Sequence, residues 1–318
     1  MSRPLVSVLM PVYNASPFLK DSVESILSQT FSDFEFLIIN DGSTDDSGAI
    51  IDSYKDTRVL HHQMARNKGI ISALNYGLSK VRGTLIARMD ADDIALPTRL
   101  AEQIDFMRSC ADVGVSGTWV EYFGERDGLM KAPAHHEEIV WAMLFGCPLF
   151  HPTVIMRSDL ILQSKLQYSA KYPHSEDYGL WVELVGQTKF ANLPKPLLKY
   201  RFSNGSVSQT FKKQQMEVSE ALKRHLHDKL IGRSLLDVEW EMINPEGNGA
   251  VNVKKVMWIY ESLNRQSQLF QRESFRKKVL LRMKQLILTR GVDLNGRLAL
   301  LNYIIYDLRI LKYLFHQS

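Results

Sequence analysis

The amino-acid sequence predicts an α/β protein in which a sheet of mostly parallel strands carries helices on both faces and is followed by a basic α-helical region. Short β-branched and aromatic runs alternate with segments of helical periodicity over the first hundred residues, as in βαβ units. Polar clusters follow several of the expected strands, and the charge balance changes sign near residue 211. With 318 residues, 45% hydrophobic and 23% charged, the chain buries a substantial core, which excludes intrinsic disorder as a description of the whole.

Strands and helices are expected in alternation along the first part of the chain. The expected strands cover residues 5–10, 34–40, 58–62, 84–89 and 113–123. The first helix begins at Ser16-Pro17, because proline is favoured at the first helical position. Apolar residues recur at helical spacing after Gly69 as far as Val81, and again after Pro97. Beyond residue 130 the pattern is less regular, and it predicts a helix at 176–185 and a strand at 197–202.

Charge divides the chain into two predicted domains, 1–211 and 212–318. The first holds 20 Lys and Arg against 24 Asp and Glu, and the second holds 19 against 11. The overall charge of +4 therefore combines a weakly acidic domain with a basic one of net charge +8. We place the boundary at this change of composition.

Cysteine usage and hydropathy predict a cytoplasmic protein. Cys110 and Cys147 fit neither a disulfide framework nor a zinc-ligand spacing. The first 14 residues lack the basic start and long apolar run of a signal peptide and are typical of a buried strand. The apolar run at 298–306 is far shorter than the ~20 residues that a spanning helix needs.

Three carboxylates, Asp90, Asp92 and Asp93, follow directly on an expected strand. Their mutual repulsion is unfavourable unless a cation or hydrogen-bond donors compensate it. Oxygen ligands without a nearby cysteine favour Mg²⁺ or Mn²⁺. The alternative is an acidic turn that caps the next helix. Asp41, at the end of the second expected strand, either caps a helix or accepts hydrogen bonds from a base or ribose. No glycine-rich phosphate loop follows any strand, so a bound nucleotide would be held through metal and carboxylates.

Four motifs, taken together in this order, resemble those of the family-two inverting glycosyltransferases with the GT-A fold. They are VLMPVYN at 8–14, SQT at 28–30 followed by Phe34 and Glu35, NDGSTD at 40–45, and DADD at 90–93. The resemblance covers residues 5–205. It implies a Rossmann-like GT-A sheet as the catalytic domain at 1–211, with the basic helical region at 212–318.

The resemblance also implies roles for individual residues on the donor side. Pro11 and Tyr13 match the motif that lies against the nucleotide base, and Asp41 matches the carboxylate that binds uracil or ribose. Asp90 and Asp92 match the D-x-D, with Asp92 the direct ligand of Mn²⁺ or Mg²⁺. The other matched positions are Asp93 near the donor sugar, and Asn67, Gly69, Ala73 and Asn75 around the helix that closes the donor pocket.

One departure from the family pattern concerns the diphosphate. Many members carry arginine just before the position of Asn75, where this chain has Leu74. The positive charge that the diphosphate needs is therefore expected from Arg66, Lys68 or Arg201.

The acceptor side of the reaction is assigned to a second acidic motif. Glu176-Asp177 resembles the family motif in which the aspartate is the catalytic base, and inverting transfer needs such a carboxylate to take the proton of the attacking hydroxyl. The alternative is a helix N-terminus enriched in acids. His151 either lines the acceptor pocket or is structural. The segments Tyr200-Arg201 and 206–208 resemble the family's closing segment.

The resemblance therefore implies transfer of one sugar, with inversion, from a nucleotide diphosphate donor, a UDP-sugar, onto a hydroxyl of a glycan or polyprenyl-linked oligosaccharide. The expected process is bacterial surface polysaccharide synthesis. A nucleotidyltransferase would carry a G-x-G-x-R loop where Met10-Pro11-Val12-Tyr13 stands. A non-catalytic nucleotide-sugar-binding module is expected to lack the acidic residues that this chain retains. No nucleic-acid partner is expected, because the basic region shows no recognised binding module.

The basic region leaves two interpretations open. Residues 276–290 carry six Lys and Arg and no acid, and apolar residues recur at helical spacing at Val279, Met283, Leu286 and Ile287 and again between Tyr306 and Leu314. Such helices lie on anionic membranes, here the inner face of the cell membrane. They also pack on a catalytic domain or in a homodimer.

Overall fold

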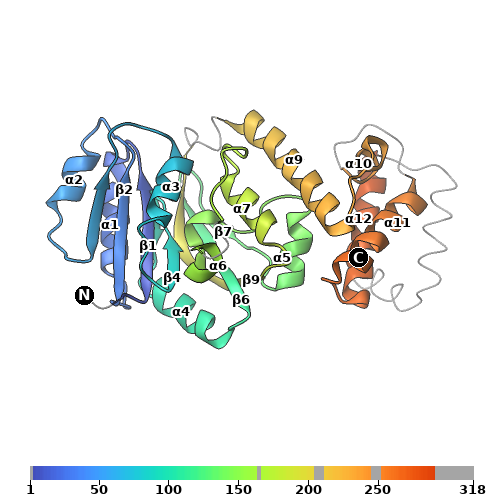
Figure 1. Ribbon diagram of the computed structural model, residues 1–318, viewed down its shortest axis with the longest axis horizontal. Helices are drawn as coiled ribbons and strands as arrows, with labels where there is room; N and C mark the ends of the chain where they lie inside the picture. Colours follow the sequence, from blue (N-terminus) through green and yellow to red (C-terminus); the bar gives the residue numbers. More distant parts are fainter. Residues whose placement is uncertain (1–2, 163–165, 204–210, 245–251, 291–318) are drawn as a thin grey trace. The chain divides into compact units, whose positions relative to one another are not determined.

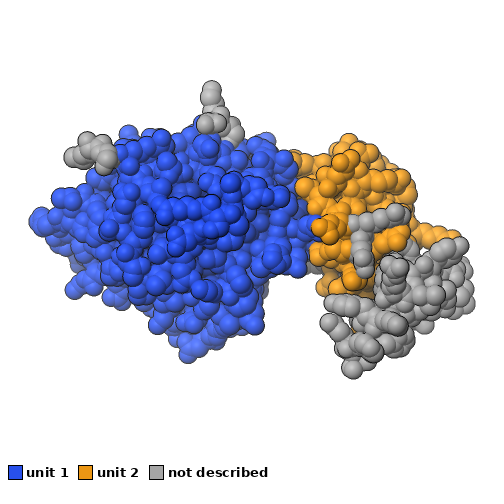
Figure 2. All heavy atoms as spheres, turned by 90° about the horizontal axis from the view of Figure 1, so that it is seen from below, with its two compact units in different colours: residues 1–222 blue, residues 223–318 orange. Residues whose placement is uncertain are grey.

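The computed structural model describes residues 3–162, 166–203, 211–244 and 252–290. The chain divides into two compact units, Met1–Leu222 and Lys223–Ser318, coloured separately in Figure 2. Helix α9 (Lys212–Ile231) begins in the first unit and ends in the second. The sequence boundary at 211 therefore lies just before this helix, whereas the two units divide within it.

The first unit is built on one mixed sheet with the strand order β3-β2-β1-β4-β8-β6-β9-β5 (Figure 1). Strands β1, β2, β3 and β4 are parallel neighbours, as the sequence predicts, and β6 and β9 are also parallel. Strands β5, β7 and β8 each pair antiparallel with their neighbours. The bounds are β1 (Val6–Val12), β2 (Phe34–Asn40), β3 (Val59–Gln63), β4 (Leu85–Arg88), β5 (Ile94–Ala95), β6 (Val113–Gly124), β7 (Gly128–Met130), β8 (Ile155–Arg157) and β9 (Lys189–Phe202).

Helices connect these strands. Those of the first unit are α1 (Ser16–Leu27), α2 (Ser47–Ser53), α3 (Ile70–Leu78), α4 (Arg99–Ser109), α5 (His136–Met143), α6 (Ser158–Leu162) and α7 (Glu176–Leu184), with a 3-10 turn at His151–Thr153. Helix α3 ends at Leu78 rather than at the expected Val81, because backbone N–H groups of 79–81 turn back onto the last helical carbonyls. Helices α5 and α6 and the short strands β5 and β7 have no counterpart in the sequence prediction.

Helices cover both faces of the sheet, as predicted. On β1, alternate residues such as Val8 and Met10 share a buried cluster with Val23 and Ile26 of α1. Leu9 has the opposite side-chain direction, since strand side chains alternate, and it packs under α3. A Cβ at Gly77 of α3 would lie 2.2 Å from Leu9 Cδ1, so glycine permits the close approach of this helix to the sheet.

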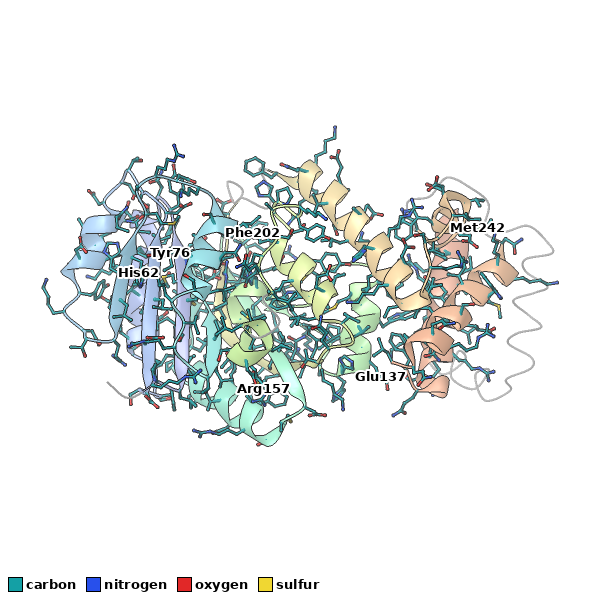
Figure 3. All side chains as sticks on the ribbon, viewed as in Figure 1. His62, Tyr76, Glu137, Arg157, Phe202 and Met242 are labelled. Carbon is teal, nitrogen blue, oxygen red and sulfur yellow. The ribbon has the colours of Figure 1, made fainter. Side chains whose placement is uncertain are left out.

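Strands β1 and β2 are buried along their full length, which is typical of parallel strands covered on both faces. Glu35 is the one charged residue in these two buried strands. Its carboxylate accepts hydrogen bonds from Ser7 Oγ at 2.6 Å and from Arg82 N and Nε at 2.9 and 2.6 Å. These donors compensate the buried charge. At the sheet edge, the rings of His62 and Tyr76 make an edge contact between β3 and α3, with centroids 5.7 Å apart (Figure 3).

The second unit contains α10 (Asp237–Ile243), α11 (Val253–Ser267) and α12 (Arg272–Arg290). Helix α11 packs against both α10 and α12. Val279, Met283 and Leu286 of α12 are buried, so this part of the predicted apolar stripe forms a helical core and is not a membrane-facing surface. The second stripe, between Tyr306 and Leu314, lies outside the described residues. Within the described ranges, no helix combines the length and apolar character needed to cross a bilayer.

Candidate active site

Three loops meet at the carboxyl ends of the parallel strands. Val12 at the end of β1 pairs with Asn40 at the end of β2, and β4 lies on the other side of β1. The segments after 12, 40 and 88 therefore leave the sheet at one edge, which is where open α/β sheets bind ligands. The sequence predicts this meeting of its first, third and fourth motifs.

Hydrogen bonds tie the first loop to the second. Asn14 has a left-handed backbone with φ of 48°, and its Oδ1 accepts from Thr44 N at 2.9 Å. Ser16 N donates to Asp45 Oδ2 at 3.0 Å. Although partial burial opposes it, hydrogen bonding from Ser47 and Ser16 lowers the pKa of Asp45 to about 2. Within this fixed loop the ring of Tyr13 is 48% exposed and accessible to a ligand, whereas Pro11 is buried in β1.

Asp41 holds the segment before α3. It is only 2% exposed, and its two carboxylate oxygens accept from Lys68 N at 2.9 Å and Gly69 N at 2.8 Å. Gly69 N also donates to Asn67 Oδ1 at 2.8 Å. Gly42, with φ of +68°, lies so close that an added Cβ would be 2.5 Å from the Arg66 carbonyl carbon. The structure thus gives Asp41 a role in loop positioning that the sequence interpretation did not include.

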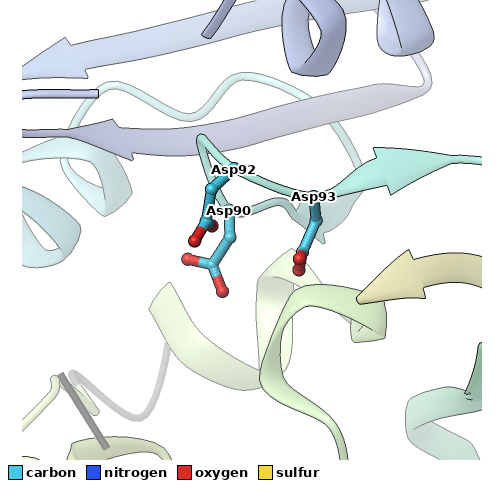
Figure 4. A group of neighbouring side chains, drawn as sticks. All are labelled: Asp90, Asp92 and Asp93. Atoms are coloured by element: carbon cyan, nitrogen blue, oxygen red, sulfur yellow. The ribbon is translucent and has the colours of Figure 1, made fainter. Parts of the chain in front are cut away.

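The three predicted carboxylates form one cluster after β4 (Figure 4). Ligand oxygens of Asp90, Asp92 and Asp93 all lie within 4.8 Å of one another. Asp93 is 1% exposed, its Oδ1 accepts from Arg201 N at 2.8 Å, and its Oδ2 has no hydrogen-bond partner among the described residues. Burial and the charge of Asp90 raise the pKa of Asp92 to about 6. Burial and both neighbouring carboxylates raise the pKa of Asp93 well above its ordinary range.

The chemistry of this donor set fits a hard divalent cation. The available ligands are carboxylate oxygens, which suit Mg²⁺ and Mn²⁺. An unpartnered buried oxygen on Asp93 and the raised pKa values both indicate negative charge that the protein itself does not fully compensate. A helix cap alone, the alternative for this motif, would leave that charge unexplained.

Arginines surround the cluster. Arg88 is 2% exposed and forms an ion pair with Asp90. Arg201 Nε donates to the Asp92 carbonyl at 2.9 Å, and its guanidinium carbon lies 4.2 Å from the Phe18 ring centroid and 4.3 Å from that of Phe123. The sequence interpretation named Arg201 but missed Arg88. The sequence signal that could have identified Arg88 is its charge at the end of an otherwise apolar strand, two positions before an acidic residue.

The second acidic motif begins α7. Glu176 is 7% exposed and its Oε2 lacks a partner among the described residues. Burial, the charge of Asp177 and, more weakly, that of Asp90 raise the pKa of Glu176 to about 7. Burial also raises the pKa of Asp177, although its Oδ1 accepts from Tyr178 N at 2.7 Å. The charges of Arg88 and Asp90 both influence the pKa of Glu176, which indicates that the two acidic motifs lie near each other.

His151 packs against the rings of Tyr168 and Trp181. It is buried, and its Nε2 lies 3.0 Å from the Tyr168 hydroxyl oxygen. Asn75 binds the backbone of Tyr168 twice, donating from Nδ2 to its carbonyl at 2.8 Å and accepting at Oδ1 from its N–H at 2.9 Å. This geometry favours the structural alternative for His151 and gives Asn75 a positioning role. The predicted closing segment at 206–208 lies outside the described residues.

The fold matches that of solved glycosyltransferases of GT-A fold. The structure of Staphylococcus aureus TarS 1–349 in complex with UDP-GlcNAc matches with a TM-score of 0.61 at 17% identity, covering 89% of this chain and 81% of that one. A mannosyltransferase from Pyrobaculum calidifontis in complex with GDP-Man and Mn²⁺ matches with a TM-score of 0.52 at 13% identity, over 97% of this chain and 81% of that one.

The sequence places the chain in a particular family. The model described as Glycosyl transferase family 2 matches residues 7–162. An uncharacterized glycosyltransferase of Haemophilus influenzae is 34% identical over 70% of this chain and 72% of its own length. The Escherichia coli UDP-Glc:alpha-D-GlcNAc-diphosphoundecaprenol beta-1,3-glucosyltransferase WfaP is 33% identical over 69% of this chain and 86% of its own. The chain belongs to glycosyl transferase family 2, which confirms the predicted family and enzyme class over the nucleotidyltransferase and non-catalytic alternatives.

Protons and a divalent cation should compete for the acidic cluster. Because the folded pKa of Asp92, about 6, lies above its unfolded value, the metal-free fold retains a proton that the unfolded chain releases, and its stability falls as pH rises from about 4 to about 6. Mn²⁺ must displace this proton below pH 6. We expect Mn²⁺ to raise the melting temperature more at about pH 7.5 than at about pH 5.

The matched variants for this measurement are Asp92→Asn and Asp105→Asn. Asp92→Asn should lose the Mn²⁺-induced shift at both pH values. Asp105, whose side chain is exposed and pairs only loosely with Arg108 at 3.8 Å, should keep the wild-type response when changed to Asn. Shifts of equal size in the wild type and in Asp92→Asn would contradict the metal role.

Proposed function

We propose that this glycosyltransferase moves one sugar, with inversion, from a UDP-sugar to a hydroxyl of a polyprenyl-linked oligosaccharide during surface polysaccharide synthesis. The observation that carries the proposal is a cluster of three carboxylates, suited to a divalent cation, whose Asp90 lies near enough to the second acidic pair to influence the pKa of Glu176. The name of WfaP specifies a UDP-glucose donor and a diphosphoundecaprenol acceptor. Another relative is named an O-antigen biosynthesis glycosyltransferase, WbnJ of Escherichia coli, and is 32% identical over 83% of its length.

The donor nucleotide is assigned to the first two loops. The exposed ring of Tyr13 offers a face for the base, and buried Pro11 shapes the strand end beneath it. Asp41 already accepts two backbone N–H groups, but each carboxylate oxygen has a further lone pair for a ribose or uracil donor. Asn67 lies in the segment that Asp41 holds. The diphosphate charge would be met by Arg201, together with Arg66 and Lys68 of the adjacent exposed segment.

Asp92 and Asp90 are the proposed ligands of Mn²⁺ or Mg²⁺, with Asp93 beside the donor sugar. When bound, the cation would stabilise the negative charge that develops on the departing diphosphate. Two solved structures that match this fold are complexes with Mn²⁺, one with GDP-Man and one with UDP. The carboxylates of this chain supply the charge and oxygen donors that such an ion requires.

Asp177 is the proposed catalytic base. A base must be ionised yet retain affinity for a proton, and burial raises the pKa of Asp177. Its Oδ1 is held by the Tyr178 N–H, which leaves Oδ2 facing the Cys147 thiol at 3.8 Å. The proton of the acceptor hydroxyl would pass to this carboxylate as the hydroxyl oxygen attacks the anomeric carbon and the bond to the diphosphate breaks.

Donor, acceptor and stereochemistry are tested together. Purified protein with Mn²⁺ is given a panel of UDP- and GDP-sugars and either a free glycan or a polyprenyl-diphosphate-linked acceptor, and release of the nucleoside diphosphate is measured. We expect release from a UDP-sugar that depends on the lipid-linked acceptor, and NMR of the product should show an inverted anomeric centre. A retained configuration would contradict the proposed mechanism, and preference for GDP-sugars would contradict the donor.

Asp177→Asn separates chemistry from donor binding. Loss of a general base should lower kcat by at least about 100-fold, while the dissociation constant for UDP with Mn²⁺ stays near the wild-type value. Glu183→Gln, on the same helix α7, is the control and should keep most of the activity. Wild-type turnover in Asp177→Asn would assign the proton transfer to another group, of which Glu176 is the nearest.

The basic region 212–318 supports a further element of the proposal, namely peripheral binding to the anionic inner face of the cell membrane, where polyprenyl-linked acceptors lie. Each basic residue near such a surface contributes roughly 1 kcal/mol. Arg282 is unavailable for this, because it is buried and donates to the Ile243 carbonyl at 3.2 Å. Lys284, in contrast, is exposed on α12.

Flotation of the full chain with lipid vesicles tests this element. We expect the protein to float with vesicles that contain phosphatidylglycerol at low salt, and to be released at high salt because screening weakens the attraction. Vesicles of phosphatidylcholine alone are the control. Failure to float with anionic vesicles at low salt would favour a purely structural role for the basic helices.

A further inference from the structure

Arg88 is a buried cation located between the two acidic motifs. It ends β4, is 2% exposed, and forms an ion pair with Asp90. Its positive charge lowers the pKa values of Asp92, Asp93, Glu176 and Asp177 against the effect of their burial. Burial would lower the pKa of Arg88 itself, but the carboxylate of Asp90 outweighs it and raises that pKa. The guanidinium is therefore a permanent charge within the acidic site.

The other buried arginine near the cluster has a different environment. Arg99 donates to the Arg88 carbonyl at 2.6 Å, to Gln103 Oε1 at 3.1 Å and to the Met89 sulfur at 3.3 Å. These contacts hold the backbone at the end of β4, and none of them involves a carboxylate. Only Arg88, among the arginines described around this cluster, forms a side-chain ion pair with one of its three carboxylates.

The ion pair between Arg88 and Asp90 has opposite effects on the stability of the metal-free protein and on cation binding. It stabilises the metal-free protein, because a buried carboxylate without a counter-charge is strongly unfavourable. It also opposes cation binding, because a divalent ion beside Asp90 is repelled by the guanidinium in a partly desolvated site. The repulsion acts on two positive charges, whereas a competing proton carries one, so removal of Arg88 should favour the metal over the proton.

We propose that Arg88 is a positioning residue that acts as an internal counter-cation for Asp90 and keeps the cluster's affinity for a divalent cation low until the donor diphosphate adds its own negative charge. The inference rests on the proposed metal-dependent transfer and concerns the order in which metal and nucleotide bind and leave. Metal and nucleotide would bind together, and the metal would leave with the product diphosphate. Without Arg88, the empty cluster would retain the ion.

The experiment measures Mn²⁺ binding by the full chain, from the EPR signal of free Mn²⁺, with and without UDP. In Arg88→Met, Mn²⁺ alone should bind at least about tenfold more tightly than in the wild type, and the enhancement of its affinity by UDP should shrink. Arg88→Lys retains the charge and should restore the wild-type pattern. Arg157→Met is the control. The hydrogen bonds that Arg157 of the neighbouring strand β8 (Figure 3) donates to described residues all go to backbone carbonyls, those of Met107, Cys110 and Val113.

A structural role alone would lower the melting temperature of Arg88→Met and of Arg157→Met without changing Mn²⁺ affinity in the folded protein. Unchanged or weaker binding of Mn²⁺ by folded Arg88→Met, while the wild type binds Mn²⁺ with UDP, would overturn this inference and leave the proposed function standing. If Arg88→Met does not fold, Arg88→Gln gives the same comparison with a hydrogen-bonding neutral side chain. A wild-type protein that binds no Mn²⁺ even with UDP would overturn the metal role and this inference together.

Discussion

Three carboxylates held at the end of one strand are the electrostatic constraint on which the site depends. Asp90, Asp92 and Asp93 lie within a few ångströms of one another in a partly desolvated place, where like charges repel strongly. Two groups offset part of this repulsion, namely the buried guanidinium of Arg88 beside Asp90 and the backbone N–H of Arg201, which donates to Asp93. These partners are fewer than the charges require, and the unpartnered oxygen of Asp93 marks the deficit.

The loops around the cluster are fixed by carboxylates with a different task. Asp41 and Asp45 both bind backbone N–H groups of neighbouring loops rather than other charges. Each accepts from backbone N–H groups at or just before the start of a helix, Ser16 of α1 for Asp45 and Lys68 and Gly69 before α3 for Asp41. Loops that have little regular structure are thereby held in place. A ligand entering here therefore finds its polar partners already ordered, which lowers the entropic cost of binding.

Most of the first half of the fold could be predicted from the sequence, because β1 to β4 and their helices are long enough to show periodicity. Strands β5, β7 and β8 have two or three residues each, too few to show a periodicity. Strand β7 forms a hairpin with the preceding β6, whereas β5 and β8 pair antiparallel with distant segments, which local pattern does not reveal. The same limit applies to the site. The carboxylates were recognisable from their crowding, whereas the pairing of Arg88 with Asp90 and the binding of Tyr168 by Asn75 depend on where the chain folds back. In the basic region, periodicity identified Val279, Met283 and Leu286 as one face, but only packing against α11 determined what covers it.

Burial raises the pKa values of the carboxyl groups in both acidic motifs, but the neighbouring charges and hydrogen-bond donors differ between the two motifs. Around Asp92 and Asp93, the nearest charges are other carboxylates, so burial adds to repulsion and favours any species that brings positive charge, whether proton or cation. At Asp177, the Tyr178 N–H and the more distant Arg88 oppose the effect of burial, and the net result is a raised pKa and a higher affinity of the carboxylate for a proton. The first environment suits a cation-binding site and the second suits a base. Two neighbouring acidic motifs, both partly desolvated, can thus support two kinds of chemistry, because backbone donors and the charge of Arg88 are distributed unequally between the two motifs.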